Sequence, residues 1–533
     1  MKPAIVLSCL AAAAASAPSP GHGPTVATAS GPIVGITTGL ANSSVDVHQF
    51  LGIPYASPPL KSLRFAPPTP PANRRGKPLY ATSWPNACIQ QGSGSLLTSQ
   101  SEDCLYLNVF SPATPAPPAG RTVMVWIHGG ALKTGTSAST EYDGSILATS
   151  QDVLVITINY RLNVFGFSNA PALPLVDRNA GFYDQRMALQ WVQENIAAFG
   201  GDPDKVTVFG ESSGSTSVSR LVSTMVVDPP FRAAILESGW YDYASIMDSA
   251  ADTTGPEAWT TLVGQLNCTS TTNSSDAELA CMRGVNSAAF SAVLVDSAVS
   301  FKGVNDNVTQ RAYPEQARLQ GEIAMVPILT GTNADEGSLF MSTSVTSWDE
   351  FAAAFPTVKS VQAQLEAVLP VSAAGPYTTQ YAADVAVATD TDFTCAVSRI
   401  VAFTAALGLP VWRYYFNATF PNTALAGYGV YHSSEIPLVF GTFTQSNATV
   451  DEVALSEAMQ WAWAKFAKDP WGSGPGWPRA GVSGGSGEQR IAALGSPNRN
   501  PSGWAMIDNS TVDERCYIYE SVFANAGGGT PWW

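Results

Sequence analysis

Charged residues are scarce in this chain of 533 residues, and basic ones are scarcer than acidic ones. Aspartate, glutamate, lysine and arginine make up only 13% of the sequence, against 45% for hydrophobic residues. The formal net charge is −15 at pH 7, and the sequence shows no extended basic patch. Nucleic acids and anionic membranes bind clustered cations, so neither is an expected partner. The apolar content excludes a disordered chain and favours a globular protein.

Long apolar runs are missing beyond the N-terminus. Lys2, an apolar run over residues 5–15 and the small residues Ala15-Ser16-Ala17 are typical of a secretory signal peptide. We expect residues 1–17 to be removed, leaving residues 18–533. No later run approaches the ~20 residues that a membrane-spanning helix needs. The sequence therefore predicts a secreted, extracellular protein without a membrane span.

Cysteine is also sparse, and no C-x-x-C pair or histidine–cysteine cluster occurs, so a metal site is not expected. Once Cys9 leaves with the signal peptide, an even number remains, which favours disulfides whose pairing the sequence alone cannot select. These cysteines are Cys88, Cys104, Cys268, Cys281, Cys395 and Cys516. Export from a eukaryotic cell would also make the Asn-x-Ser/Thr sequons acceptors for glycosylation. The sequons are Asn42, Asn267, Asn273, Asn307, Asn417, Asn447 and Asn509.

Buried-strand patterns alternate with helical ones through much of the chain. Residues 123–127 and 153–158 are unbroken apolar, β-branched runs, typical of strands covered on both faces. A helical pattern over 183–199 precedes a short strand at 205–209, and this order predicts a parallel sheet. Further elements are expected as a hairpin over 25–34, strands at 234–236 and 326–329, and a helix at 456–468. The Gly-rich stretch 472–487 is interpreted as a loop within one large domain.

One serine lies where a nucleophile is expected. Gly210-Glu-Ser212-Ser-Gly214 matches G-x-S-x-G between the strand at 205–209 and a helical segment at 215–222, which is the context of a nucleophile elbow. The pattern also occurs around Ser483, but in a Gly- and Pro-rich loop without a strand before it. Context therefore favours Ser212.

A serine nucleophile needs a histidine base, and only four histidines are present. His22 lies near the predicted cleavage site. His48 falls in an alternating segment that predicts an edge strand and a structural role. His128 precedes two glycines, where a hydrogen bond that organises the loop is expected. Elimination leaves His432, on a loop late in the chain.

The remaining groups follow from the chain order of this chemistry, which is serine, acid, histidine. Asp335-Glu336-Gly337 follows the strand predicted at 326–329, and either carboxylate is a candidate acid; a solvated acidic turn is the alternative. Backbone N–H groups that stabilise an oxyanion are expected from Ser213 and from the turn His128-Gly-Gly-Ala131.

Nine segments spread over nearly the whole mature chain share one further pattern. They are FLGIPYA at 50–56, LRF at 63–65, EDCLYLNV at 102–109, WIHGG at 126–130, NYR at 159–161, residues 199–214, ESG at 237–239, NADEG at 333–337 and HSSE at 432–435. Together they resemble the type-B carboxylesterases, a family that includes cholinesterases and fungal lipases, and in particular its secreted fungal esterases. The resemblance implies an α/β-hydrolase fold, in which helices flank a large, mostly parallel central sheet in a single large domain.

The resemblance also assigns roles to residues. It implies Glu336, rather than Asp335, as the acid beside Ser212 and His432, and an oxyanion hole of Gly130, Ala131 and Ser213. Supporting positions are Gly129, Glu211, Ser238 and Glu435. The implied disulfides are Cys88–Cys104, Cys268–Cys281 and Cys395–Cys516.

Two departures from the family bear on the substrate. Ala131 stands where relatives commonly have a third glycine. The alanine keeps the backbone N–H donor, but its methyl group narrows the space above the turn. The segment between Cys88 and Cys104 is shorter than the flap of family lipases and lacks the tryptophan with which cholinesterases hold a quaternary ammonium. We therefore expect neither an interfacial lipase nor a choline esterase.

The sequence predicts a serine carboxylic ester hydrolase for small to medium esters that needs no cofactor or metal. Its only expected partner is the small-molecule ester, and the sequence determines no oligomeric state. The alternatives are a lipase for longer acylglycerols, a specialised esterase for a secondary metabolite or toxin, and a catalytically dead adhesion relative. The intact serine, glutamate and histidine set argues against the last, because a binding protein has no need of a strained elbow.

Overall fold

The computed structural model describes residues 23–41, 43–90, 98–240, 255–296, 299–481, 490–495 and 503–526. The predicted signal peptide, the sequon Asn42 and the second G-x-S-x-G serine, Ser483, lie outside these residues. Within them, no helix is both long enough and apolar enough to cross a membrane.

A sheet of eleven strands forms the centre of the molecule. Its strands, in spatial order, are β16 (Trp504–Asp508), β15 (Arg490–Leu494), β14 (Val411–Phe416), β13 (Ile328–Asn333), β12 (Ala233–Glu237), β11 (Gly201–Glu211), β9 (Arg121–Ile127), β10 (Leu154–Ile158), β8 (Tyr106–Pro112), β4 (Val47–Pro54) and β3 (Ile36–Thr38). The strands from β15 to β10 pair in parallel, and those toward both edges pair antiparallel. The predicted central strands are thus neighbours, β9 and β10.

The N-terminal segment contributes to two sheets. The predicted hairpin over 25–34 is confirmed as β1 (Thr25–Thr28) and β2 (Gly31–Val34), which form a small sheet with β5 (Leu79–Tyr80). A further pair is β6 (Ala87–Cys88) and β7 (Gln100–Ser101). The edge position expected for the His48 strand is wrong, because β3 pairs outside β4 and Thr37 hydrogen-bonds His48 across the two strands.

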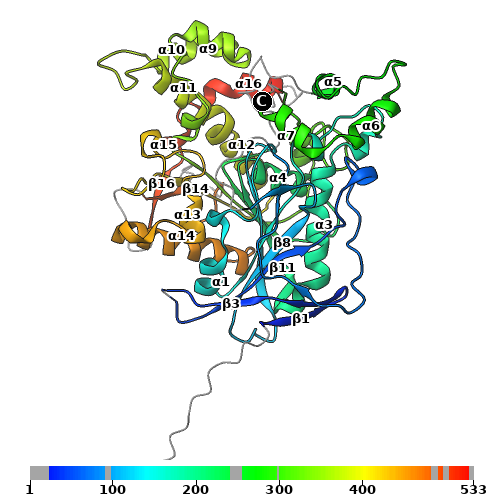
Figure 1. Ribbon diagram of the computed structural model, residues 1–533. Coiled ribbons are helices and arrows are strands. Elements are labelled where there is room, and N and C mark those ends of the chain that lie inside the picture. Colours follow the sequence, from blue (N-terminus) through cyan, green and yellow to red (C-terminus); the bar gives the residue numbers. More distant parts are fainter. Residues whose placement is uncertain are drawn as a thin grey trace, which may run out of the picture.

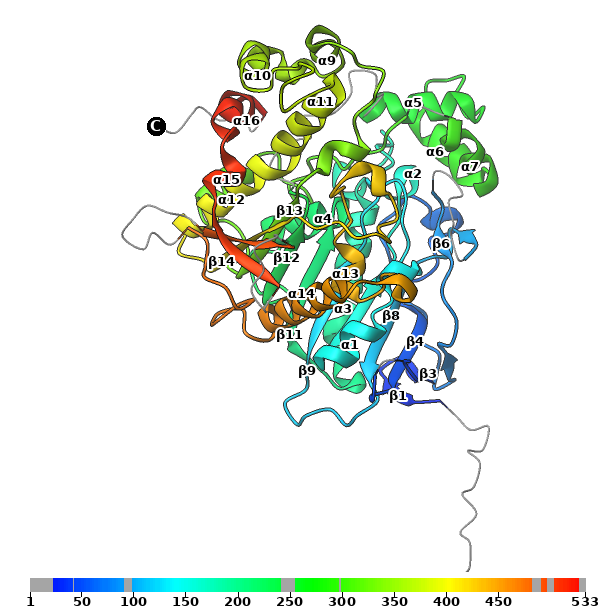
Figure 2. The same ribbon diagram turned by 90° about the vertical axis from the view of Figure 1, so that its left-hand side faces the viewer.

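Helices cover both faces of the large sheet (Figures 1 and 2). The helices of the described residues are α1 (Ser145–Gln151), α2 (Asn163–Gly166), α3 (Ala180–Asn195), α4 (Ser213–Thr224), α5 (Gly255–Gln265), α6 (Ser275–Gly284), α7 (Ser287–Asp296), α8 (Pro314–Leu319), α9 (Trp348–Ala354), α10 (Gln362–Val368), α11 (Gln380–Thr389), α12 (Cys395–Ala406), α13 (Ile436–Phe440), α14 (Val450–Lys468), α15 (Ser510–Asp513) and α16 (Glu520–Ala526). In Figure 1, α3 lies on one side of the sheet and α13 and α14 lie on the other.

Alternation along the central strands builds two cores. Val123 and Val125 of β9 belong to a core that includes residues of α3 and α4, whereas Met124 and Trp126 belong to one that includes α1, α13 and α14. Successive side chains of a strand point to opposite faces, so β9 is buried on both. This explains why residues 123–127 of this strand are all apolar.

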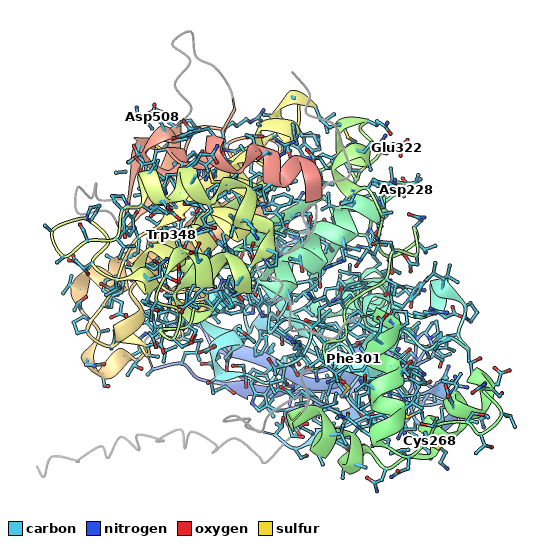
Figure 3. The ribbon with its side chains drawn as sticks, turned by 90° about the horizontal axis from the view of Figure 1, so that it is seen from above. Asp228, Cys268, Phe301, Glu322, Trp348 and Asp508 are labelled. Carbon is cyan, nitrogen blue, oxygen red and sulfur yellow. A yellow bond between two sulfur atoms is a disulfide. The ribbon has the colours of Figure 1, made fainter. Side chains whose placement is uncertain are left out.

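Two groups of helices stand at one end of the sheet. α5–α7 and α9–α11 gather at the top of Figure 1. Figure 3 shows the molecule from above, with Cys268, just after α5, and Trp348 of α9 on opposite sides. The disulfides join Cys88 to Cys104, Cys268 to Cys281 and Cys395 to Cys516, the pairs that the family resemblance implies.

A buried ion pair attaches the loop after β10 to α3. Arg161 donates from Nε and Nη2 to the two carboxylate oxygens of Asp184, each at 2.7 Å, and the Asp184 side chain is fully buried. The Arg161 Nη1 also donates to Ala66 O at 2.7 Å. A bidentate pair of this kind fixes the geometry of both segments.

Replacing Arg161 with Met should therefore strongly destabilise the protein. The substitution leaves the buried Asp184 carboxylate unpaired, and we expect the free energy of unfolding, measured by urea denaturation, to fall by about 3–5 kcal/mol. The matched control is Lys205→Met, which removes the more exposed Lys205–Asp202 pair and should cost less than about 1 kcal/mol. Equal losses for the two variants would contradict the importance assigned to the buried pair.

Candidate active site

Ser212 occupies a sharp turn between β11 and α4. Its backbone has φ 56° and ψ −126°, a strained conformation for a residue other than glycine. Its N–H donates to Glu237 O at 3.0 Å. A Cβ atom on Gly210 or Gly214 would lie 2.6 or 2.0 Å from Ile127 O at the end of β9. Both glycines of the motif are therefore required by the neighbouring strand.

His432 and Glu336 come from loops that follow two other parallel strands. Glu336 begins the turn after β13, and His432 lies on the loop after β14. Nδ1 of His432 is 2.5 Å from Oε2 of Glu336, and Glu336 is completely buried. The Asn333 N–H donates to the other carboxylate oxygen at 2.7 Å, which fixes its orientation.

Asp335, the other candidate acid, has a different partner. Its Oδ2 accepts from the Val430 N–H at 2.8 Å, and its own N–H donates to Val430 O at 3.0 Å. Asp335 therefore holds the backbone two residues before His432. The structure brings Glu336, and not Asp335, to the imidazole.

The second imidazole nitrogen faces Glu211, the residue before Ser212. Nε2 of His432 lies 3.1 Å from Oε1 of Glu211 but makes no hydrogen bond to any described residue, Ser212 included. Ser212 is partly exposed, while Glu211 and His432 are buried. Catalytic hydrogen bonds are often long or misaligned in a ligand-free enzyme and tighten when substrate binds, so the absence of a Ser212 bond here is compatible with a base at Nε2.

The charges around His432 favour its protonated form. Burial by itself would lower the pKa of His432, but the carboxylates of Glu211 and Glu336 raise it to about 9. Burial in turn raises the pKa of Glu211, against the attraction of His432. Once neutral, His432 is therefore a stronger base than an ordinary imidazole, which suits a group that must take a proton from serine.

The turn after β9 lies directly against the elbow. Gly130, Ala131 and Leu132 have φ values of 102°, 57° and 59°, and Leu132 N–H donates to Oγ of Ser213 at 3.2 Å. Among the described residues, the N–H groups of Gly130 and Ala131 have no acceptor. Ser213 begins α4, where helical N–H groups lack partners as well. These amides can accommodate a developing negative charge.

His128 precedes this turn and organises it, as the sequence predicts. Its Nδ1 lies 2.9 Å from Gly129 O, and its ring stacks on Tyr160 with centroids 4.5 Å apart. Burial lowers the pKa of His128 to about 4. The histidine is therefore neutral and structural.

Supporting residues surround this centre, and some of them have no sequence signal. Ser238 has φ 52° and is buried beside the elbow. Asn333, whose backbone N–H orients Glu336, also donates through Nδ2 to Glu435 at 2.5 Å. It therefore connects the two glutamates. Trp463 of α14 donates to Glu237 at 3.0 Å. Asn333 lies within the NADEG motif, but only its contacts indicate a role.

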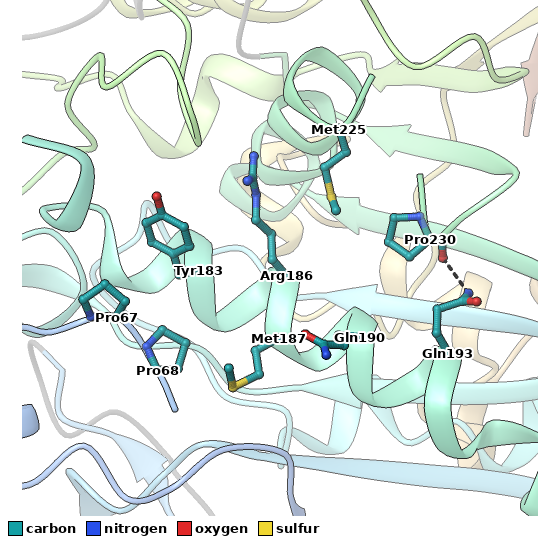
Figure 4. Close-up of a pocket in the computed structure, with 9 residues that line it drawn as sticks. All are labelled: Pro67, Pro68, Tyr183, Arg186, Met187, Gln190, Gln193, Met225 and Pro230. Carbon is teal, nitrogen blue, oxygen red and sulfur yellow. Dashed lines mark hydrogen bonds between the residues drawn. The ribbon is translucent and has the colours of Figure 1, made fainter. Parts of the chain in front are cut away.

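An open groove elsewhere on the surface is separate from this centre. It has a volume of about 380 Å³ and lies along the outer face of α3 (Figure 4). Its lining comprises Pro67, Pro68, Tyr183, Arg186, Met187, Gln190, Gln193, Met225 and Pro230. None of these residues belongs to the site around Ser212.

A strained serine on a strand–helix turn, at the end of parallel strands that also supply an imidazole–carboxylate pair, defines an α/β-hydrolase. The sequence comparisons name the family: the pattern of the Carboxylesterase family matches residues 22–499, so the chain belongs to that family and is a carboxylic ester hydrolase. The expectations of fold and enzyme class are confirmed.

Relatives agree with this placement. The chain is 34% identical to the para-nitrobenzyl esterase of Bacillus subtilis, covering 81% of this chain and 88% of that one. It is 33% identical to the human cocaine esterase, covering 85% of each chain. A solved structure of a PNB esterase superposes with a TM-score of 0.74 at 30% identity, covering 93% of this chain and all of that one.

Gly129 is the glycine of this turn that packs directly against Glu211 and Ser212. A Cβ atom there would lie 2.8 Å from Oε2 of Glu211 and 3.0 Å from Cβ of Ser212. We expect Gly129→Ala to lower kcat for p-nitrophenyl acetate by roughly 100 to 1000-fold, the loss typical of a disturbed oxyanion hole. The control Gly264→Ala, where a Cβ atom meets nothing within 4 Å, should keep wild-type kcat; a similar loss there would contradict the steric argument.

Glu211 should set the pH at which activity appears. His432 must be neutral to act as a base, so kcat/KM falls as pH drops below its pKa, which Glu211 and Glu336 raise. Glu211→Gln removes one of these charges, and the acid limb of the kcat/KM profile should move to lower pH. Glu350→Gln, at an exposed position, should leave the profile unchanged. An unshifted limb in the Glu211 variant would mean that this carboxyl is neutral in the free enzyme.

Proposed function

We propose that Ser212, His432 and Glu336 are the nucleophile, base and acid of a catalytic triad. The observation that carries this assignment is the contact between Nδ1 of His432 and Glu336, which leaves Nε2 without a hydrogen bond and 3.1 Å from Glu211, the residue before the strained Ser212. Glu336 selects the imidazole tautomer that presents a free Nε2 and stabilises the imidazolium that forms.

The reaction is acyl transfer to water. His432 takes the proton of Ser212 as its Oγ attacks the ester carbonyl, and the N–H groups of Gly130, Ala131 and Ser213 stabilise the tetrahedral oxyanion. Collapse breaks the bond to the alcohol, which leaves with the proton from His432. Water, deprotonated by His432, then attacks the acyl-enzyme and forms a second tetrahedral intermediate. Collapse of this intermediate breaks the bond to Ser212 Oγ, releases the carboxylic acid and returns the proton from His432 to Ser212.

The substrates we propose are small to medium carboxylic esters. Relatives named for para-nitrobenzyl ester and cocaine hydrolysis support this choice, as does the short segment between Cys88 and Cys104. Ala131, with its positive φ of 57°, carries a methyl group where a glycine would leave space, which favours compact acyl groups. The lipase, the specialised esterase and the inactive adhesion relative are the alternatives that a substrate series separates.

We propose further that the enzyme is a secreted glycoprotein of the fungal esterase branch. The disulfides and the exposed sequons favour an oxidising, extracellular setting. The exposed sequon asparagines are Asn267, Asn273, Asn307, Asn417 and Asn447. Asn509 is half-buried and donates to Asp513 at 3.4 Å, so it is the least accessible acceptor among those that the structure describes.

Hydrolysis of p-nitrophenyl esters from acetate to palmitate tests the proposal. The wild type should hydrolyse the short esters best, and Ser212→Ala should reduce kcat by roughly a million-fold, as loss of a serine nucleophile does. The control is Ser483→Ala, in the second G-x-S-x-G sequence, which should keep wild-type rates.

Three results would contradict specific parts of this assignment. A preference for palmitate would favour the lipase alternative. Loss of activity in the Ser483 variant would indicate that Ser483, and not Ser212, is the nucleophile. A wild type that is inactive across the series, with no difference from Ser212→Ala, would favour the binding-protein alternative.

A further inference from the structure

Two phenylalanines contact the imidazole of His432. The ring centroids of Phe340 and Phe393 lie 5.1 and 5.0 Å from that of His432, and the two phenyl rings stack at 6.0 Å with an interplanar angle of 16°. Aromatic contacts of this geometry stabilise the position of a ring. Phe340 is 52% exposed but Phe393 only 9%, so Phe393 is the one that the protein interior can hold in place.

Phe393 lies in an unusual backbone segment. Residues Asp390–Thr394 form a π-helical turn between α11 and α12. Such turns are rare and widen the helix, which changes where its side chains point, and they are frequent at functional sites. A regular helix through these residues would place Phe393 differently, so the turn determines whether its ring meets His432.

The same region packs against the segment of the acid. A Cβ atom on Gly337, the residue after Glu336, would lie 2.5 Å from Val385 O and 2.7 Å from Cβ of Ala388, both in α11. The Gly337 N–H donates to Thr389 Oγ1 at 3.0 Å. The π-helical turn therefore contacts His432 through Phe393, and the end of α11 contacts the residue directly after Glu336.

The C-terminal segment, residues 513–519, holds the turn from the other side. Arg515 donates from Nε and Nη2 to the two oxygens of the buried Asp390 at 2.7 and 3.0 Å, and the Tyr519 hydroxyl donates to the same carboxylate at 3.2 Å. The disulfide from Cys516 ends at Cys395, directly after the turn.

A second ion pair fixes the end of the turn. Arg413 of β14 donates to both oxygens of Asp513 at 2.7 and 2.8 Å, and its Nη2 also donates to Thr394 O at 3.2 Å. Asp513 and Arg413 are both buried in this pair. The two ends of residues 513–519 are thus attached to the two ends of the π-helical turn.

We propose that residues 513–519 are a positioning element for the catalytic histidine, acting through the π-helical turn and the ring of Phe393. This inference rests on the proposed role of His432 as the base. Arg515 and Phe393 are positioning residues: neither reacts, but the ion pair of the first holds the turn on which the second contacts the imidazole. The C-terminal segment would then affect the rate of acyl transfer without contributing a group to it.

The test compares two variants with a control in the same region. Phe393→Leu removes the ring and keeps an apolar side chain, while Arg515→Gln removes the charge that holds Asp390. Arg399→Gln is the control, because Arg399 pairs with Glu315 and Glu520 just beyond residues 513–519. The measurements are kcat and KM for p-nitrophenyl acetate, and the NMR resonance of the proton between His432 and Glu336 in histidine-labelled protein.

Displacing a catalytic group by about 1 Å can cost 100-fold in rate. We therefore expect Phe393→Leu and Arg515→Gln to lower kcat by roughly 10 to 100-fold with little change in KM, and to shift or broaden the His432–Glu336 proton resonance. Arg399→Gln should leave kcat and the resonance unchanged even if it lowers the melting temperature. If Arg515→Gln does not fold, Asp390→Asn carries the same expectation.

The proposal is overturned if Arg515→Gln behaves as Arg399→Gln does in both measurements, or if Phe393→Leu leaves the resonance unchanged. Its failure is distinguishable from that of the proposed function. A wild type without activity on any ester would contradict the triad assignment, whereas the resonance would still report whether Phe393 and Arg515 position His432.

Discussion

The carbonyl of Ile127 comes so close to the chain around Ser212 that a side chain on Gly210 or Gly214 would collide with it. This contact exists because β9 and β11 pair in parallel, with Ile127 opposite Gly210. The same pairing places the turn after β9 beside Ser212, and β12, β13 and β14 continue in the same direction. Every group of the site therefore depends on the parallel register.

Burial of charge is the second constraint, and it follows from the first. Bringing the ends of β11, β12, β13 and β14 together concentrates Glu211, Glu237, Glu336 and Glu435 in the interior, and three of them, Glu211, Glu336 and Glu435, raise the pKa of His432. Like charges raise one another's pKa values when water is excluded. The protein offsets this with donors from Asn333 and Trp463, and the remaining negative charge favours the imidazolium that the reaction forms.

The helices beyond the sheet add contacts to His432 that do not come from the ends of the parallel strands. α11, α12 and the π-helical turn between them bring Phe393 to His432, and residues 513–519 hold that turn through two ion pairs and a disulfide. Such contacts join the C-terminal end of the chain to the centre of the sheet. Regions of this kind can differ among relatives while the elbow and the strand ends stay the same.

Local patterns in the sequence were enough to predict the strands and helices with a strong hydrophobic periodicity, and the residues that a strand–turn–helix motif places. The strands β9 and β10, the helix α3, the elbow at Ser212 and the elimination of three histidines all depend on neighbours in the chain. The family resemblance added the disulfide pairs and the choice of Glu336. Only the tertiary structure decided the position of β3 outside β4, the use of Asp335 to hold Val430, and the approach of Phe393 to His432. Each of these joins residues far apart in sequence, and the energy of such a contact depends on distances that only the folded chain defines.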